Sequence, residues 1–265
     1  TFNLDPTQLA AARSDRTRAV IPVHLFGLCA DMDAIKTALP SDTLVLEDAA
    51  CATGGAYKGR ASGSMGNAGV FSFHPRKTIT TGKGGMITTN DSALAERLVQ
   101  MRNHGASISE EDRHNGAQPY SLPEFKTLGF NYRMTDLQGA LGVAQIAKLD
   151  RFIAERDKAA KFYDEALGEI DWLYPQVLGD DYTHSWQAYV CRVDTAKAPM
   201  SRNEFMKVLQ DEWQISSRPG THAVHSLGIY REKFGFTEND FPVAWNCHRN
   251  TIALPLHNRM TESDY

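Results

Sequence analysis

Residues 69–85 read GVFSFHPRKTITTGKGG, and this stretch decides the fold. It opens with the apolar pattern of a buried strand, and Lys77 follows where that strand ends. A lysine just beyond a strand is usually a solvated surface residue. Here its neighbours Thr78 to Thr81 carry no charge, and the glycines that follow let the backbone approach another group closely. We therefore predict an amine held out of water, which is a usable nucleophile toward an aldehyde.

Outward from this stretch, short apolar runs alternate with helical patterns. The sequence predicts helices at 31–39, at 92–102 behind the cap Asn90-Asp91, and from Thr135, where a capping box opens a helix that runs to 149 or on to 163. Such alternation predicts an α/β fold with a mostly parallel sheet covered by helices. The expected strands are 18–26, 43–46, 69–74 and 85–89.

The pattern changes after residue 105. Residues 106–128 are polar and without periodicity, which predicts a long ordered loop. Beyond it the sequence predicts strands at 185–193 and 251–256 and a capped helix at 201–212. We expect a large domain over residues 1–155 and a smaller α+β carboxyl-terminal domain over residues 156–265.

Composition narrows the classes of function. The 265 residues carry a formal net charge of -4, so there is no basic footprint for nucleic acid or an acidic membrane. The four cysteines form no CxxC pair, which argues against a zinc or thioredoxin-type site and favours free thiols in a reducing compartment. We expect no metal site. No apolar run reaches the length of a membrane span, so the expected location is the cytoplasm.

Asp48 is the second residue of interest, because it ends the apolar run that begins at Thr43. The carboxyl ends of strands in open α/β sheets are where ligands bind. A buried carboxylate there needs a partner. Taken alone, Asp48 is interpreted as the N-cap of a helix over residues 49 onward. The alternative is that it pairs with a cationic nitrogen of a ligand.

Six ordered segments resemble the DegT/DnrJ/StrS family of nucleotide-sugar aminotransferases, which depend on pyridoxal phosphate. Together they extend through most of the chain. They are IPVHLFG (21–27), LEDAA (46–50), the stretch from YKGRAS to ITTND (57–91), RNHG (102–105), GFNYRMTDLQGALG (129–142) and LPLHNRMTESDY (254–265). The resemblance implies an aspartate-aminotransferase type of fold (fold type I of the pyridoxal phosphate enzymes) and a homodimer with shared active sites.

The resemblance also implies roles for single residues. Lys77 is similar to the lysine that binds the cofactor as a Schiff base, and Asp48 to the carboxylate that pairs with the pyridine nitrogen. Cys51 occupies the position at which many members carry Gln or His over the cofactor ring. Ser72 resembles the serine that binds the cofactor phosphate, and Asn131 the asparagine that reaches that phosphate from the neighbouring subunit. Ser72 also fits the outer face of a strand, and Asn131 a turn residue after Gly129.

Three further residues are implied as substrate contacts. Arg133 lies beside Asn131, and His222 and His225 belong to a segment, RPGTHAVH (218–225), that is similar to the family's RPHYxPLH. Each histidine reads equally well as a structural, hydrogen-bonded residue. The catalytic pair implied by the resemblance is Lys77 and Asp48.

The implied reaction moves an amino group from an amino acid, glutamate in the family, to a keto group of a nucleotide-linked sugar. Two alternatives stay open. One is a sugar dehydratase of the same fold, although such members carry His in place of the lysine. The other is a non-catalytic scaffold or regulatory subunit, since the family's amino-terminal segment and last helix have no counterpart in these 265 residues.

Overall fold

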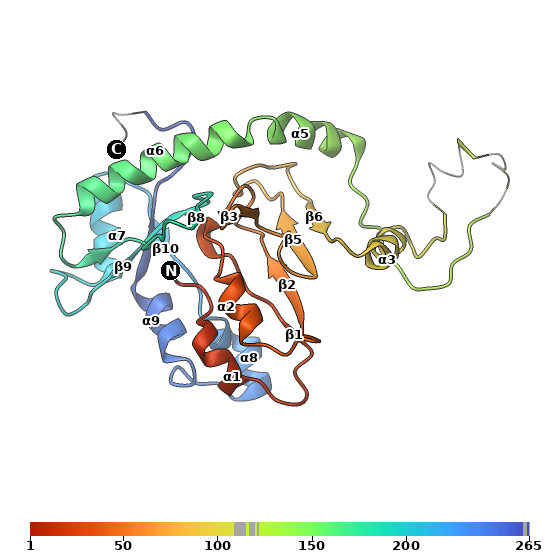
Figure 1. The fold of residues 1–265 in the computed structure, drawn as a ribbon. Coiled ribbons are helices and arrows are strands. Elements are labelled where there is room, and N and C mark those ends of the chain that lie inside the picture. Colours follow the sequence, from red (N-terminus) through yellow and green to blue (C-terminus); the bar gives the residue numbers. More distant parts are fainter. Residues whose placement is uncertain (109–114, 117–119, 121, 262–263, 265) are drawn as a thin grey trace.

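The computed structural model describes residues 1–108, 115–116, 120, 122–261 and 264 (Figure 1). Its central sheet has the strand order β1-β2-β5-β6. The first three of these strands are parallel, and β6 is antiparallel to β5. The prediction of a mostly parallel α/β sheet is therefore confirmed. The bounds are β1 Ala19–Val20, β2 Leu44–Asp48, β5 Ala68–Ser72 and β6 Gly85–Thr88.

Helices surround this sheet and continue beyond it. The capping signals are confirmed: Asp91 Oδ1 accepts from the first turn of α3, and Thr135 and Gln138 form the capping box of α5. A second capping box, Ser201 with Glu204, opens α7. The α-helices are α1 Leu9–Ala12, α2 Met32–Thr37, α3 Ser92–Arg102, α5 Asp136–Ile146, α6 Leu149–Leu167, α7 Arg202–Asp211, α8 Gly228–Phe234 and α9 Pro242–Asn250, and the 3-10 turns are η1 Pro6–Gln8, η2 Leu25–Gly27 and η3 Val224–Ser226.

Three expected elements are wrong in extent, and the first is the strand expected over 185–193, which begins only at Tyr189. The strand predicted over 18–26 ends after two residues, and the chain then turns through η2, where Phe26 has a φ of 61° and Gly27 a φ of 110°. The helix predicted from Thr135 onward is two helices. Lys148 separates them because its φ of -108° and ψ of 1° leave the helical path. In Figure 1 α5 and α6 lie end to end above the central sheet.

A second sheet lies in the carboxyl-terminal part, with the order β10-β11-β9-β7 and antiparallel pairing throughout. It packs a core that includes Ala160 of α6, Trp186, Tyr189 and Ile252. A small third sheet pairs β3 with β4 and, from far along the chain, with β8. The bounds are β3 Ala56–Tyr57, β4 Arg60–Ala61, β7 Leu173–Tyr174, β8 Tyr182–Thr183, β9 Tyr189–Val193, β10 Arg218–Pro219 and β11 Thr251–Leu254.

The division of the chain at residue 155 stays a prediction. Helix α6 crosses that position without interruption, and the β3–β8 pairing joins residues from both sides of it. Part of the loop predicted over 106–128 lies outside the described residues. Among the helices that are described, none is long and apolar enough to cross a membrane.

The connection between β8 and β9 holds a buried histidine with both ring nitrogens engaged. His184 Nδ1 accepts from Trp186 N (2.7 Å), so the proton sits on Nε2, which donates to Gln176 Oε1 (3.1 Å). The His184 ring stacks on the indole of Trp186 with centroids 3.9 Å apart. Burial lowers the pKa of His184 to about 3, and the nearby Asp157 carboxylate offsets this only in part.

Because of His184, we expect the folded protein to lose stability as the pH falls, beginning at pH values above those at which carboxylates become protonated. In the unfolded chain His184 binds a proton near its ordinary pKa, but in the folded protein it stays uncharged down to about pH 3. The unfolded state therefore binds more protons as the pH falls below the ordinary histidine value, and stability is lost. Between pH 7 and pH 5 this residue alone should lower the free energy of unfolding by about 2 kcal/mol.

Urea denaturation at the two pH values checks this. His184→Asn, whose side-chain oxygen can still accept from Trp186 N, should show a smaller loss between pH 7 and pH 5 than the unsubstituted protein. An equal loss in both proteins would assign the acid sensitivity to other groups.

Candidate functional site

Lys77 lies in the turn that follows β5. Its backbone N–H donates to His74 O (2.9 Å), and the residue is half-buried. The ammonium nitrogen, Nζ, lies 3.1 Å from Cys51 Sγ. The lysine side chain is thus directed back to the end of the neighbouring strand β2.

Asp48 ends β2 and begins the short turn that carries Cys51. Asp48 Oδ1 accepts from Ala50 N (3.0 Å), and Ala52 N donates to Ala49 O (2.9 Å). Asp48 therefore caps a turn, and the expectation of a helix N-cap is wrong, because no helix follows β2 in this described part of the chain. Because Cys51 lies three residues further along this turn, the Lys77–Cys51 contact brings the amine to the same turn as the carboxylate.

Ser72 and Asp48 belong to one face of the sheet. Asp48 is in register with Val70 on the parallel strand β5, and Ser72 follows Val70 by two residues. Register partners point to the same face, as do residues two apart on a strand. The Ser72 hydroxyl accepts from His74 N at 3.4 Å. A hydroxyl, a carboxylate and an amine therefore gather at the carboxyl ends of β2 and β5, where ligands of open α/β sheets bind.

On the opposite face of β2, Glu47 forms a fully buried network that the sequence analysis missed. Its carboxylate accepts from Gly63 N (2.7 Å), Met65 N (2.6 Å), Gly66 N and His24 Nε2 (2.9 Å). His24 Nδ1 accepts from Ala30 N (3.1 Å), so Nε2 carries the donated proton. The available signal was an acidic residue inside an otherwise apolar strand.

Burial and hydrogen bonding act on Glu47 in opposite directions. Burial favours the protonated acid, whereas the bonds from His24 and from the backbone N–H groups of Gly66 and Gly63 favour the carboxylate. The bonds prevail, and the pKa of Glu47 lies below its ordinary value. The carboxylate thereby ties the loop 63–66 and the turn at His24 to the strand that ends in Asp48.

Asn131 and Arg133 lie on the segment between α3 and α5. Asn131 forms a bridge with Asn103, and both Asn131 and Arg133 are exposed. Arg133 donates from Nε to Asn131 Oδ1 (3.2 Å) and from Nη1 to Asn103 Oδ1 (3.1 Å). Within the described residues no hydrogen bond joins Asn131 to Lys77, Asp48 or Ser72.

His222 and His225 belong to the carboxyl-terminal part of the chain. His222 is exposed, and its ring centroid lies 5.6 Å from that of His248. His225 is buried against Phe241, and its Nε2 has no hydrogen-bond partner among the residues described. These contacts do not link either histidine to Lys77, so their role as substrate contacts stays a prediction.

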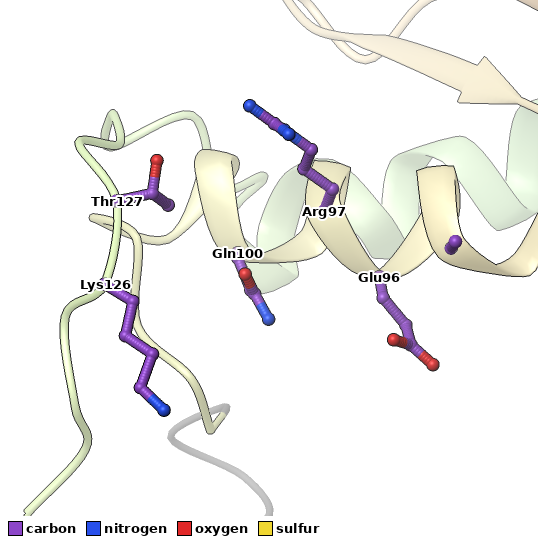
Figure 2. A pocket seen from close by; sticks show the side chains of 6 residues that line it. Glu96, Arg97, Gln100, Lys126 and Thr127 are labelled. Atoms are coloured by element: carbon purple, nitrogen blue, oxygen red, sulfur yellow. The ribbon is translucent and has the colours of Figure 1, made fainter.

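The depression drawn in Figure 2 is separate from these residues. It is lined by Ala93, Glu96, Arg97 and Gln100 of α3 together with Lys126 and Thr127. Arg97 points to the opposite side of α3 from Glu96 (Figure 2), and Lys126 is paired with Glu124 at 2.7 Å. Because its charged groups do not converge, this depression has no evident chemistry.

Comparison with known proteins gives one consistent result. The model of the DegT/DnrJ/EryC1/StrS aminotransferase family matches residues 1–265. The chain is 40% identical to the spore coat polysaccharide biosynthesis protein SpsC of Bacillus subtilis and 36% identical to the GDP-perosamine synthase of Caulobacter vibrioides. All of this chain is covered in both matches, against 68% and 67% of the two relatives.

Solved structures with a similar fold are aminotransferases as well. Spr1654 of Streptococcus pneumoniae, solved in a pyridoxal phosphate form, superposes with a TM-score of 0.88 at 24% identity, over 100% of this chain and 69% of that one. This likeness establishes the aminotransferase type of fold. The aminotransferases of the matching family use pyridoxal phosphate and act on sugars, and they are generally dimeric.

The residues at the ends of β2 and β5 fit this cofactor. Its aldehyde requires a primary amine, its ring nitrogen an acidic partner and its phosphate hydroxyl or N–H donors. Lys77, Asp48 and Ser72 are groups of these three kinds. The buried hydroxyl of Thr78, the residue after Lys77, has no partner among the described residues, which is unusual for a group so enclosed. The chemical groups of these residues therefore suit pyridoxal phosphate, an aldehyde that carries an anionic phosphate.

Because of the hydrogen-bond network around Glu47, we expect Glu47→Gln, which keeps the shape of the side chain, to lower the stability of the protein substantially. Glu47→Gln replaces one accepting oxygen by an N–H₂ group that faces donors, so at least one buried donor loses its partner. The free energy of unfolding should fall by about 2–3 kcal/mol. Asp33→Asn, at an exposed carboxylate paired with Lys58 and Arg60, is the control and should change stability much less. Denaturant titration compares the two, and equal losses would refute the buried role of Glu47.

Proposed function

Because the chain belongs to the DegT/DnrJ/EryC1/StrS aminotransferase family, we propose that it transfers an amino group from an amino acid, preferably glutamate, to a keto group of a nucleotide-linked sugar. Its cofactor is pyridoxal phosphate. The observation that carries the proposal is the 3.1 Å approach of Lys77 Nζ to Cys51 Sγ, in the turn that begins at Asp48. The GDP-perosamine synthase among its relatives supports a nucleotide-linked acceptor.

In this proposal three side chains hold the cofactor. Lys77 would bind its aldehyde through Nζ, Asp48 would pair with the ring nitrogen, and Ser72 would donate to the phosphate. Pyridoxal phosphate supplies an electron-accepting ring that stabilises negative charge at the donor carbon. The fixed charge of Asp48 assists by keeping a proton on the ring nitrogen.

Lys77 would have a second role, because its amine, when it is not attached to the cofactor, can act as a base. Nζ then accepts the proton from the donor carbon and returns it to complete the transfer, as a general base and acid. Cys51 Sγ lies within contact distance of Nζ and supports the amine on one side. The half-buried position of Lys77 limits the water that competes for this proton.

The proposal includes a homodimer in which Asn131 serves the neighbouring subunit. Large apolar side chains before it and on the following helix α5 are exposed: Leu128 by 93%, Leu137 by 85% and Val143 by 70%. The rings of Phe130 and Tyr132 stack next to Asn131 with centroids 4.8 Å apart. An apolar surface of this kind is typical of a protein–protein contact. Sedimentation velocity tests the proposal, and an active monomer would contradict it.

Lys77→Ala should lower turnover by at least about 10³-fold, because both the covalent attachment and the general base are lost. Lys83→Ala is the matched control, since Lys83 is exposed in the same glycine-rich segment and makes its contacts through its backbone carbonyl. The assay follows 2-oxoglutarate formation from glutamate with a nucleotide-linked keto sugar. Appreciable turnover in the Lys77 variant would end the assignment.

Borohydride reduction of the cofactor-loaded protein gives an independent measurement. The visible absorption band should disappear, and peptide mapping should find the label on Lys77. A folded protein without a band would favour a non-catalytic scaffold. Comparing a nucleotide-linked keto sugar with the free sugar tests the acceptor class, because only the linked form should react well if the nucleotide contributes to binding.

A further inference from the structure

Residues 184–188 (HSWQA), here termed the β8–β9 crossing, run from the small third sheet into the carboxyl-terminal sheet. The backbone of the crossing lies along the turn η2 near the central sheet. Ser185 N donates to Gly27 O (3.0 Å), and Ala188 N donates to Phe26 O (3.3 Å). The carboxyl-terminal part of the chain is thereby joined to the part that carries Lys77.

Two side chains of the crossing reach backbone carbonyls on either side of the Lys77–Cys51 contact. Gln187 Nε2 donates to Arg76 O (3.1 Å), the carbonyl of the peptide bond that leads into Lys77. Ser185 Oγ lies 3.3 Å from Cys51 O and 3.4 Å from Gly27 O, so its single proton is shared between them. One short segment thus contacts both the turn that carries the amine and the turn that carries the sulfur.

The crossing is held in an unusual conformation. Trp186 has a φ of 48°, which is costly for a bulky side chain and persists only where the surroundings impose it. Its indole Nε1 donates to Asp157 Oδ1 (3.0 Å), and its carbonyl accepts from the buried Arg156 Nη1 (2.8 Å). With the stacked His184, these contacts anchor Trp186.

The turn η2 is shaped to receive the crossing. Gly27 has a φ of 110°, and a Cβ atom at this position would lie 2.6 Å from Ser185 Oγ and 2.9 Å from Trp186 N. Only a residue without a side chain permits this approach. The alignment of Ser185 and Gln187 is therefore set by packing on both sides of the crossing.

We propose that Gln187 and, more weakly, Ser185 are positioning residues that hold the Lys77 turn and the Cys51 turn in register, so that Nζ is presented to the cofactor. The proposal rests on Lys77 being the lysine that binds the cofactor. Arg76 is exposed, and apart from Gln187 its turn is held by Lys77 N to His74 O and Arg76 N to His74 Nδ1 (3.2 Å). Loss of the Gln187 bond leaves the peptide before Lys77 held at its N–H but not at its carbonyl, which widens the range of its orientations and lowers the fraction of molecules with Nζ correctly aimed.

A purely structural tie between the two parts of the chain is the competing explanation. Such a tie would change stability and leave the reaction of the amine alone. Gln187→Met separates the two, because Met keeps the length of the side chain and lacks the N–H donor. Gln187→Glu also keeps the shape, but its carboxylate faces the Arg76 carbonyl and should act more strongly.

The experiment mixes the full protein, freed of cofactor, with pyridoxal phosphate and follows the appearance of the visible band. For Gln187→Met the rate should fall about 3- to 10-fold, the range that one net hydrogen bond allows. Gln187→Glu should be slower still, and Ser185→Ala should fall less. Gln8→Met, at an exposed glutamine bonded to Asp5, is the control and should keep the original rate. Thermal midpoints without cofactor should agree between Gln187→Met and the control.

Three results would overturn the proposal. An unchanged rate in both Gln187 variants removes the positioning role. A slower rate in Gln187→Met together with a thermal midpoint below that of the control would mean that Gln187 acts by stabilising the fold. A borohydride label on another lysine of the unsubstituted protein, or no label, refutes the proposed function and this inference with it. A label on Lys77 with unchanged rates refutes the inference alone.

Discussion

The buried carboxylate of Glu47 is the constraint on which the candidate site depends. A charge inside a protein is tolerated only when its surroundings replace the hydrogen bonds of water, and here His24 and three backbone N–H groups do so. Those donors come from a turn before β2 and from a loop after it. The hydrogen bonds to this one carboxylate therefore hold the turn at His24 and the loop 63–66 against β2. The next residue, Asp48, points to the opposite face of the sheet in a fixed orientation.

The parallel pairing of β2 with β5 places a second turn beside the one that follows Asp48. Because β2 and β5 run in the same direction, their carboxyl ends lie at one edge of the sheet, and the turns after them carry Cys51 and Lys77. The β8–β9 crossing then meets both turns through Ser185 and Gln187. The amine is thus positioned by a strand pair on one side and by the carboxyl-terminal part of the chain on the other.

Local signals predicted the elements whose ends are determined by their own residues. Helix α3 begins and ends as predicted, because Asp91 caps its first N–H groups and an apolar stripe continues to Arg102. The capping boxes of α5 and α7 are local in the same sense. The strand expected over 18–26 was too long, because an apolar run does not reveal where packing against residues 184–188 forces a left-handed turn at Phe26 and Gly27. The strand expected over 185–193 was too long for the same reason: its first part is the crossing.

By itself the sequence determined the fold class and the family, since these depend on residue types in a fixed order, and it nominated Lys77 as the amine that we propose to be reactive. Only the tertiary structure decided which groups surround that amine. Glu47, Ser185 and Gln187 make hydrogen bonds between segments as far apart as Cys51 and Ser185. Hydrogen bonds of that kind depend on the path of the whole chain, and no local pattern of side chains encodes them.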